Sequence, residues 1–347
     1  MVRRPQLKSP GFILTPAAPP GVVGKGMEIV GVNLTARLTR QRDEDAKFAE
    51  LKKKLAKAEL EVMNKSGVDV VTLAGEIRKW RAGQRDKPQP SPKTPGMQPG
   101  VPSELAAVPG YSVVTPPYTY EWSQTGYVNY APAPPATRSA NADAETGALG
   151  FIDESSPESG QVNISWTAAA VGISFRPQVA GVLSVQTMVS MTVFWNYLET
   201  FAGCNTRGWA GFLVQGYETR EPHKLVVTPI YQEIIVFDRG ASGTKPDADL
   251  LFDGTVTGNY FAPSFSVVPS RYYAIWFWCG GDIHTEGWNE FGLGSCAGGS
   301  IDTSVPYFLL NYQPQASTPT ISRKKIRPKS TSIPTSPRTR AKRTRNR

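Results

Sequence analysis

Short strand-like stretches of apolar residues recur from about Gly160 to Gln313. Val162, Ile164 and Trp166, for example, alternate with polar neighbours, which is the period-two pattern of a half-buried strand. Turn residues separate these stretches, and no helical pattern of any length interrupts them. Since no crossover helices are present to cover a parallel sheet, the pattern predicts a mainly β fold, an antiparallel β-sandwich or jelly roll over residues 138–315.

A helical pattern precedes the strands, in residues 32–83. Five apolar residues with 3-4-3-4 spacing share one face of the first predicted helix: Phe48, Leu51, Leu55, Ala58 and Val62. Gly67 ends this helix and Asp69 can cap a second one, so the segment is predicted to be an N-terminal helical hairpin. The apolar stripe packs on the partner helix or on the β domain, or it joins two copies as a short coiled coil. Two heptads are too few to decide between these interpretations.

Proline and glycine mark the segments on either side of the hairpin. Residues 1–31 are rich in both and are predicted to form an extended arm. Residues 84–137 are predicted to be a Pro-rich linker, because proline recurs too often for a helix or a central strand. The second half of this linker carries Tyr118, Tyr120 and Trp122. We expect these rings to pack on a surface, either in an arm that crosses to a neighbouring subunit or in the first strand of the β domain.

Charge is distributed unevenly along the chain. There are 38 Lys and Arg residues against 29 Asp and Glu residues, a net charge of +9. Eleven of the basic residues and no acidic residue lie between positions 323 and 347, so the remainder has 27 basic and 29 acidic residues. The C-terminal segment 316–347 is also rich in Pro, Ser and Thr, and it is predicted to be a disordered basic tail.

This basic tail is the strongest functional signal in the sequence. The candidate polyanion-binding residues are Arg323, Lys324, Lys325, Arg327, Lys329, Arg338, Arg340, Lys342, Arg343, Arg345 and Arg347. Arg binds phosphate through a planar fork and Lys binds it as a point charge, and the release of counterions makes such binding tight at low salt and independent of sequence. No aromatic residue is present in the tail for base stacking. We therefore expect nucleic acid or another polyanion as the partner; the alternative is a solubilising or targeting tail.

A candidate metal site lies near one of the two histidines, His223 and His284. Asp282, His284 and Glu286 alternate along an extended segment, so they face the same way, and all three residue types bind divalent metals. A polar hairpin loop is the alternative interpretation. No nucleophile elbow and no P-loop occur in the chain. The protein is therefore predicted not to be an enzyme and to need no cofactor.

Aromatic rings are numerous, and Trp and Tyr suit stacking on sugar rings. Most of them are expected to fill the core, because the two alternating sets of side chains in residues 271–279 cannot both face water. Tyr197 and Trp288, in turn-like surroundings, are the candidates for contact with a glycan. Three cysteines are predicted to be free thiols in preference to a disulfide between the last two: Cys204, Cys279 and Cys296.

Parts of the β segment resemble a group of uncharacterised bacterial β-sandwich proteins, in residues 172–185, 271–279 and 305–309. The motifs that carry this resemblance are structural, and it implies no activity. The architecture is also similar to that of RNA-virus coat proteins, in which a charged arm binds the genome and a jelly roll builds the shell. Such arms are more often N-terminal.

Together these features predict a non-enzymatic interaction or assembly protein, in which the β-sandwich forms a binding surface and the C-terminal arm binds nucleic acid. The alternatives are a viral jelly-roll capsid protein that packages RNA or DNA, and a lectin-like module that binds glycans. A homo-oligomer is expected. No apolar stretch has the length of a signal peptide or of a membrane-spanning helix. We therefore expect a soluble protein in the cytoplasm, or in the virion if it is a coat protein.

Overall fold

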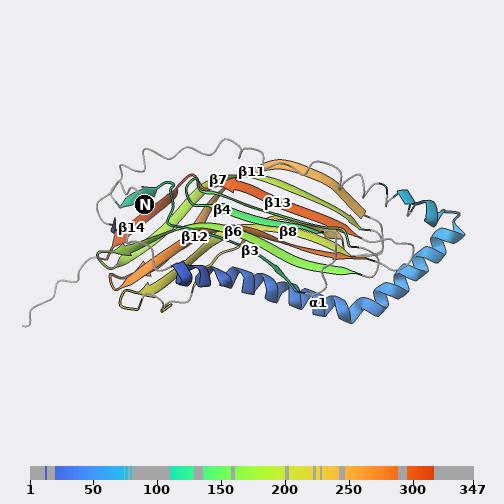
Figure 1. Cartoon of the computed structure of the whole chain (residues 1–347), viewed down its shortest axis with the longest axis horizontal. Coiled ribbons are helices and arrows are strands. Elements are labelled where there is room, and N and C mark those ends of the chain that lie inside the picture. Colours follow the sequence, from blue (N-terminus) through green and yellow to red (C-terminus); the bar gives the residue numbers. More distant parts are fainter. Residues whose placement is uncertain are drawn as a thin grey trace, which may run out of the picture. The chain divides into compact units, whose positions relative to one another are not determined.

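The computed structural model is mainly β, with one long helix near the N-terminus (Figure 1). It describes residues 12–13, 20–73, 75–76, 79, 110–128, 136–157, 161–199, 203–221, 224–226, 229–241, 247–287 and 295–315. The helix α1 spans Pro20–Lys65. The strands are β1 (Phe12–Ile13), β2 (Tyr111–Val114), β3 (Tyr120–Tyr127), β4 (Ala136–Asp143), β5 (Ala148–Ser155), β6 (Val162–Pro177), β7 (Gly181–Glu199), β8 (Cys204–Glu218), β9 (Ile230–Tyr231), β10 (Ile234–Ala241), β11 (Asp247–Val267), β12 (Arg271–Glu286), β13 (Cys296–Ser304) and β14 (Phe308–Pro314).

The strands form two antiparallel sheets of seven strands each. The first sheet has the order β1-β6-β12-β8-β10, with β3 also paired to β6 and β9 to β8. The second has the order β2-β14-β7-β13-β5-β4, with β11 also paired to β7. The prediction of a mainly β fold with antiparallel sheets is therefore confirmed.

Eight of these strands pair in a nested pattern along the chain. The first of the eight, β5, pairs with the last, β13, and the second, β6, pairs with β12. Further inward, β7 pairs with β11 and β8 pairs with β10. Two more pairings, β13 with β7 and β12 with β8, join these hairpin-like pairs into the two sheets.

The main hydrophobic core lies between the two sheets. Ile275 and Phe277 of β12 point into it from the first sheet, and Val189 and Val193 of β7 point into it from the second. Tyr260 of β11 packs edge to face on Phe277 with 5.2 Å between ring centroids. Burial of apolar surface in this layer is the dominant favourable contribution to folding of the two sheets.

The outer face of the first sheet is buried as well, because α1 packs across it. Trp276 and Trp278 of β12 belong to this second core, together with Leu34 and Leu38 of α1. Both alternating sets of side chains in residues 271–279 are therefore core, one between the sheets and one beneath the helix. This double coverage explains why the central strands of the first sheet are apolar on both faces.

The predicted N-terminal arm, residues 1–31, overlaps the start of α1. The chain is already helical at Pro20, whereas residues 1–31 were expected to be extended. The physical reason is a buried apolar stripe with helical spacing that begins well before residue 32: Met27, Val30, Leu34 and Leu38, each 0% exposed. Contact with the sheet stabilises this part of the helix in spite of its glycines, each of which costs about 1 kcal/mol of helix propensity.

Two of these glycines are required by the contact itself. A Cβ atom on Gly26 would overlap the side-chain amide of Gln215, and one on Gly31 would lie 2.6 Å from Cη2 of Trp166. At both positions a neighbouring side chain would have to shift to admit a larger residue, so glycine allows the helix backbone to lie close on the sheet.

A tight turn follows α1. Gly67 has a φ of 76°, and Asp69 then accepts hydrogen bonds from the N–H groups of Val71 and Thr72 at 3.1 and 3.0 Å. This is the N-cap arrangement expected at Asp69, and helical residues resume at Val70.

The Pro-rich linker predicted over residues 84–137 contains strands in its second half. β2 pairs with β14, and β3 pairs with β6. Tyr118 is buried between the sheets and Tyr120 beneath α1, so aromatic burial fixes this part of the chain against the β core. Residues 84–109 and the tail 316–347 lie outside the described residues.

Candidate functional site

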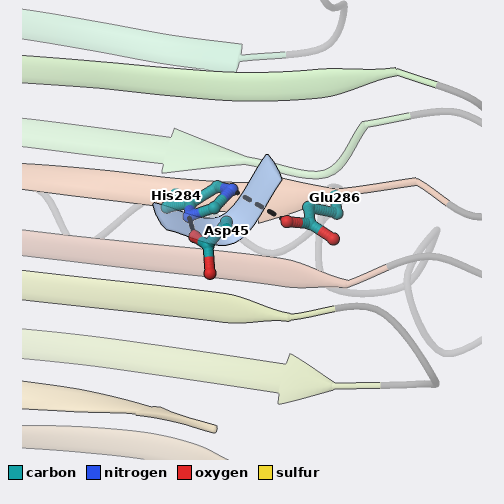
Figure 2. Close-up of side chains that lie close together, drawn as sticks. All are labelled: Asp45, His284 and Glu286. Atoms are coloured by element: carbon teal, nitrogen blue, oxygen red, sulfur yellow. Dashed lines mark ion pairs between the residues drawn. The ribbon is translucent and has the colours of Figure 1, made fainter. Parts of the chain in front are cut away.

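Asp45, His284 and Glu286 lie together where α1 crosses the end of β12 (Figure 2). Nδ1 of His284 is 3.3 Å from Oδ2 of Asp45, and Nε2 is 3.1 Å from Oε1 of Glu286. One ligand atom from each of the three residues lies within 4.8 Å of the others. Within the described part of the chain, these three side chains are thus close enough to hold a metal ion.

β12 supplies two of the three residues. His284 and Glu286 share one face of the strand because alternate residues of a strand point the same way. The N–H of Glu286, the last residue of β12, donates to Oγ of the fully buried Ser295 at 2.9 Å. This hydrogen bond fixes the backbone at the end of β12 and therefore the position of the Glu286 carboxylate beside His284.

α1 supplies the third residue, and its docking contacts determine where Asp45 lies. Nε1 of Trp166 donates to Oγ1 of Thr35 at 2.8 Å. The guanidinium of Arg37 lies 4.0 Å above the ring of Trp209 and 2.6 Å from Oε1 of Glu233. Asp45 follows Arg37 by two helical turns, so it reaches the sheet on the same face of the helix.

His284 is the buried member of the group, with 6% of its side chain exposed against 30% for Asp45 and 23% for Glu286. A carboxylate faces each of its ring nitrogens. A neutral imidazole carries one N–H and can donate to one carboxylate, whereas a doubly protonated ring can donate to both. A metal ion on one nitrogen is another way to satisfy both sides of the ring.

Asp282, the third residue of the predicted metal set, lies outside this close group. It faces the same side of β12 two residues before His284, and it is 1% exposed. Burial raises the pKa of its carboxyl to about 7, although the positive charges of Arg207 and Arg37 oppose that rise. Asp45 takes its place in the group, and no signal in the sequence identified Asp45, because the packing of α1 on β12 is a long-range contact.

A second buried carboxylate, Asp153, lies in a polar network between the sheets. Oγ of Ser165 donates to Asp153 at 3.0 Å, Oγ1 of Thr167 donates at 3.3 Å, and Nε of Arg138 lies 3.3 Å away. Burial raises the pKa of Asp153 to about 7, while the charge of Arg138 and the hydrogen bonds oppose that rise. Ser165, Thr167 and Arg138 are its hydrogen-bond and charge partners, so this network links β5, β6 and β4 within the sandwich.

The other candidate residues are placed as follows. Tyr197 is 9% exposed and belongs to a small buried cluster with Ile283, so the expectation of an exposed ring for a glycan is wrong at this position. Trp288 and His223 lie outside the described residues, as do all eleven basic residues of the tail. None of the three cysteines, all of which the structure describes, is in a disulfide: Cys204, Cys279 and Cys296.

In the described residues, no helix is both long enough and apolar enough to cross a membrane. A scan against protein-family models, a search of curated proteins and a search of solved structures each gave no match.

Proposed function

We propose that this protein is a non-enzymatic assembly protein, a capsid-like jelly roll whose copies build a shell and whose C-terminal basic segment binds nucleic acid. The observation that carries the proposal is the segregation of charge. A near-neutral two-sheet body is followed by a segment with eleven Lys or Arg residues and no Asp or Glu. Such a segment neutralises phosphates without recognising bases, which suits the packaging of any nucleic acid of the right length.

The nested strand pairing supports the jelly-roll part of the proposal. A jelly roll arises when an antiparallel ribbon of eight strands, paired 1 with 8, 2 with 7, 3 with 6 and 4 with 5, wraps into two sheets. The strands β5, β6, β7, β8, β10, β11, β12 and β13 have these four pairings in chain order. Jelly rolls of this kind occur in viral capsid and lectin domains.

The far half of α1 supports association between copies. It carries four exposed apolar side chains with heptad spacing: Phe48 (57% exposed), Leu51 (54%), Leu55 (48%) and Val62 (62%). Acidic residues 43–45 and 50 precede a run of lysines at 52–54 and 57. Two copies that pair antiparallel through this stripe would therefore place opposite charges face to face. A second copy of the chain is the occupant that fits both the spacing and the charge.

The nucleic-acid part is tested with the full chain and two tail variants. In one variant all eleven Lys and Arg residues of 323–347 become Gln, and in the matched control the order of residues 323–347 is scrambled. We expect wild type and the scrambled control to form particles by negative-stain microscopy with a raised ratio of absorbance at 260 nm to 280 nm, and the Gln variant to lose the nucleic acid. Binding should weaken with salt, with a slope of log K against log[salt] of up to about −10 for eleven charges on duplex DNA. Equal binding by the Gln variant would overturn the role of the tail.

The assembly part is tested by Leu51→Gln with Leu55→Gln, against the control Thr72→Gln on the exposed helical turn after α1. Sedimentation velocity should show smaller species for the double variant and unchanged species for the control, with unchanged circular dichroism for both. A wild type that remains monomeric with and without nucleic acid would contradict the shell.

A further inference from the structure

Buried oxygen atoms without hydrogen-bond partners gather between α1 and the first sheet. Both carboxylate oxygens of Asp282 are buried and unpartnered, as are Oε1 of Gln41 and Oδ1 of Asn205. Asp282 is 1% exposed, so water does not reach it from the surface. Buried polar groups in folded proteins are nearly always paired, so this group of acceptors calls for a donor or a cation.

The register of the strands and the helix places these oxygens close to His284. α1 and β12 run side by side in the same direction: Arg37 lies over Trp209, which pairs with Gly280, and Asp45 contacts His284. Four helical residues advance about 6 Å and two strand residues advance about 6.6 Å, so the helix and the strand keep in step.

Gln41 lies halfway along α1 between Arg37 and Asp45. Asp282 lies halfway along β12 between Gly280 and His284, so this register places Gln41 over Asp282. Asn205 is directly opposite His284 on the neighbouring strand β8 and faces the same side. By this register, the residues that carry the unpartnered oxygens lie in the same layer as the Asp45–His284–Glu286 group.

The positive side chains nearest to this layer are held by other carboxylates. Arg207, opposite Asp282 in the register, lies 2.8 Å from Oδ1 of Asp238. Arg37 lies 2.6 Å from Oε1 of Glu233. Three carboxylates, an imidazole and two amide oxygens thus share a layer in which acceptors outnumber donors.

We propose that this layer binds one divalent transition-metal ion, such as Zn²⁺, between Nδ1 of His284 and Asp45, with Glu286 as the hydrogen-bond acceptor of Nε2 and the buried carboxyl of Asp282 beside the ion. Mixed imidazole and carboxylate ligands suit Zn²⁺. Two ligands about 2.0–2.2 Å from one ion lie roughly 2.8–3.6 Å apart, and Nδ1 of His284 lies 3.3 Å from Oδ2 of Asp45. A ligating imidazole usually donates its other N–H to a carboxylate, and here a carboxylate faces each nitrogen.

The ion joins α1 to β12 where Asp45 meets His284. Because the ion binds the docked arrangement and not the unfolded chain, added metal raises the midpoint of thermal unfolding. No residue of the basic tail belongs to the proposed site, so the site can be tested independently of nucleic-acid binding.

The test uses untagged full-length protein freed of metal with a chelator. Calorimetric titration with Zn²⁺ should give one site per chain, and Co²⁺ should give visible absorption bands of a protein-bound ion. We expect Asp45→Asn and Glu286→Gln each to weaken Zn²⁺ binding by about 10–100-fold, and His284→Gln to abolish it. The controls Asp43→Asn, on the exposed side of α1, and His223→Gln should bind as wild type does, and so should the variant with the neutralised tail.

Two results would overturn the proposal. One is wild-type protein that binds no stoichiometric Zn²⁺ at 100 µM metal. The other is an Asp45→Asn variant with wild-type affinity, judged on protein whose circular dichroism is unchanged. Asp45 is partly exposed, so this variant keeps the test decisive even if His284→Gln fails to fold.

Discussion

The two halves of α1 carry the same kind of apolar stripe in different surroundings. In the first half, Met27, Val30, Leu34 and Leu38 are completely buried against the first sheet. In the second half, Phe48, Leu51, Leu55 and Val62 are between 48 and 62% exposed. The apolar residues therefore have the same helical periodicity in both halves, and the halves differ in whether the sheet packs against them.

The docked half of α1 differs from the exposed half in how closely its backbone approaches the sheet. Gly26 and Gly31 bring the backbone of the first half against Gln215 and Trp166, and their counterparts are missing in residues 46–65, which contain no glycine. A helix with large side chains all round would stand further from the sheet and bury less apolar surface. The Asp45–His284–Glu286 group marks the end of the docked half.

The largest expected effect comes from removing a buried side chain of the docked half. Leu34→Ala leaves a cavity over the first sheet and should lower the free energy of unfolding by about 2–5 kcal/mol. The matched variant Leu55→Ala, in the exposed half, should change it by less than about 0.5 kcal/mol. Urea unfolding followed by tryptophan fluorescence measures both, because Trp166 and Trp276 lie beneath α1. Equal losses in the two variants would mean that the far half is also docked.

The sequence predicted the sheets better than the helix because the two signals differ in range. Alternation of apolar and polar residues is a local consequence of strand geometry, so antiparallel strands such as β6 could be recognised directly. Gly26 and Gly31 look like chain breakers locally and become helix residues only through their contact with Trp166 and Gln215. Asp45 was missed for the same reason, since nothing near it in the chain indicates His284.

Some strands could not be predicted from the sequence because of their composition. β13, Cys296–Ser304, is rich in Gly and Ser and has little apolar alternation. A Cβ on Gly299 would lie 2.6 Å from Oγ1 of Thr206 and 2.8 Å from Cζ of Phe237, so the close packing of the two sheets excludes a larger residue there. Such a strand can be recognised only once its neighbours are known.

The buried carboxyl of Asp153 should make the stability of the sandwich depend on pH. The pKa of Asp153 is raised to about 7 by burial, against about 3.9 in an unfolded chain. Between these values the folded protein holds a proton that the unfolded chain has released, so the free energy of unfolding falls as pH rises from about 4 to 7 and levels off above. The Arg138 pairing reduces the size of this effect, and we expect about 1–3 kcal/mol.

Asp153→Asn should remove the share of Asp153 from this slope and leave the share of Asp282, whose pKa is also raised to about 7 by burial. The control Asp43→Asn, on the exposed side of α1, should leave the slope unchanged. Urea unfolding at several pH values in the presence of a chelator measures the slope. An identical slope in wild type and Asp153→Asn would show that Asp153 does not retain its proton in the folded protein.

The smallest effect tests the glycines that distinguish the two halves. Gly31→Ala gains helix propensity of up to about 1 kcal/mol, but its Cβ meets Trp166 at 2.6 Å. The ring of Trp166 is held by its hydrogen bond to Thr35, so it cannot move aside freely. Overpacking of this kind costs about 1–3 kcal/mol, and the net change should be a loss of about 1 kcal/mol. Gly75→Ala is the matched control, because no atom lies within 4 Å of the new Cβ and helix propensity alone acts there, so stability should rise slightly. If both substitutions stabilised the protein, close approach would not be what holds the first half of α1 on the sheet.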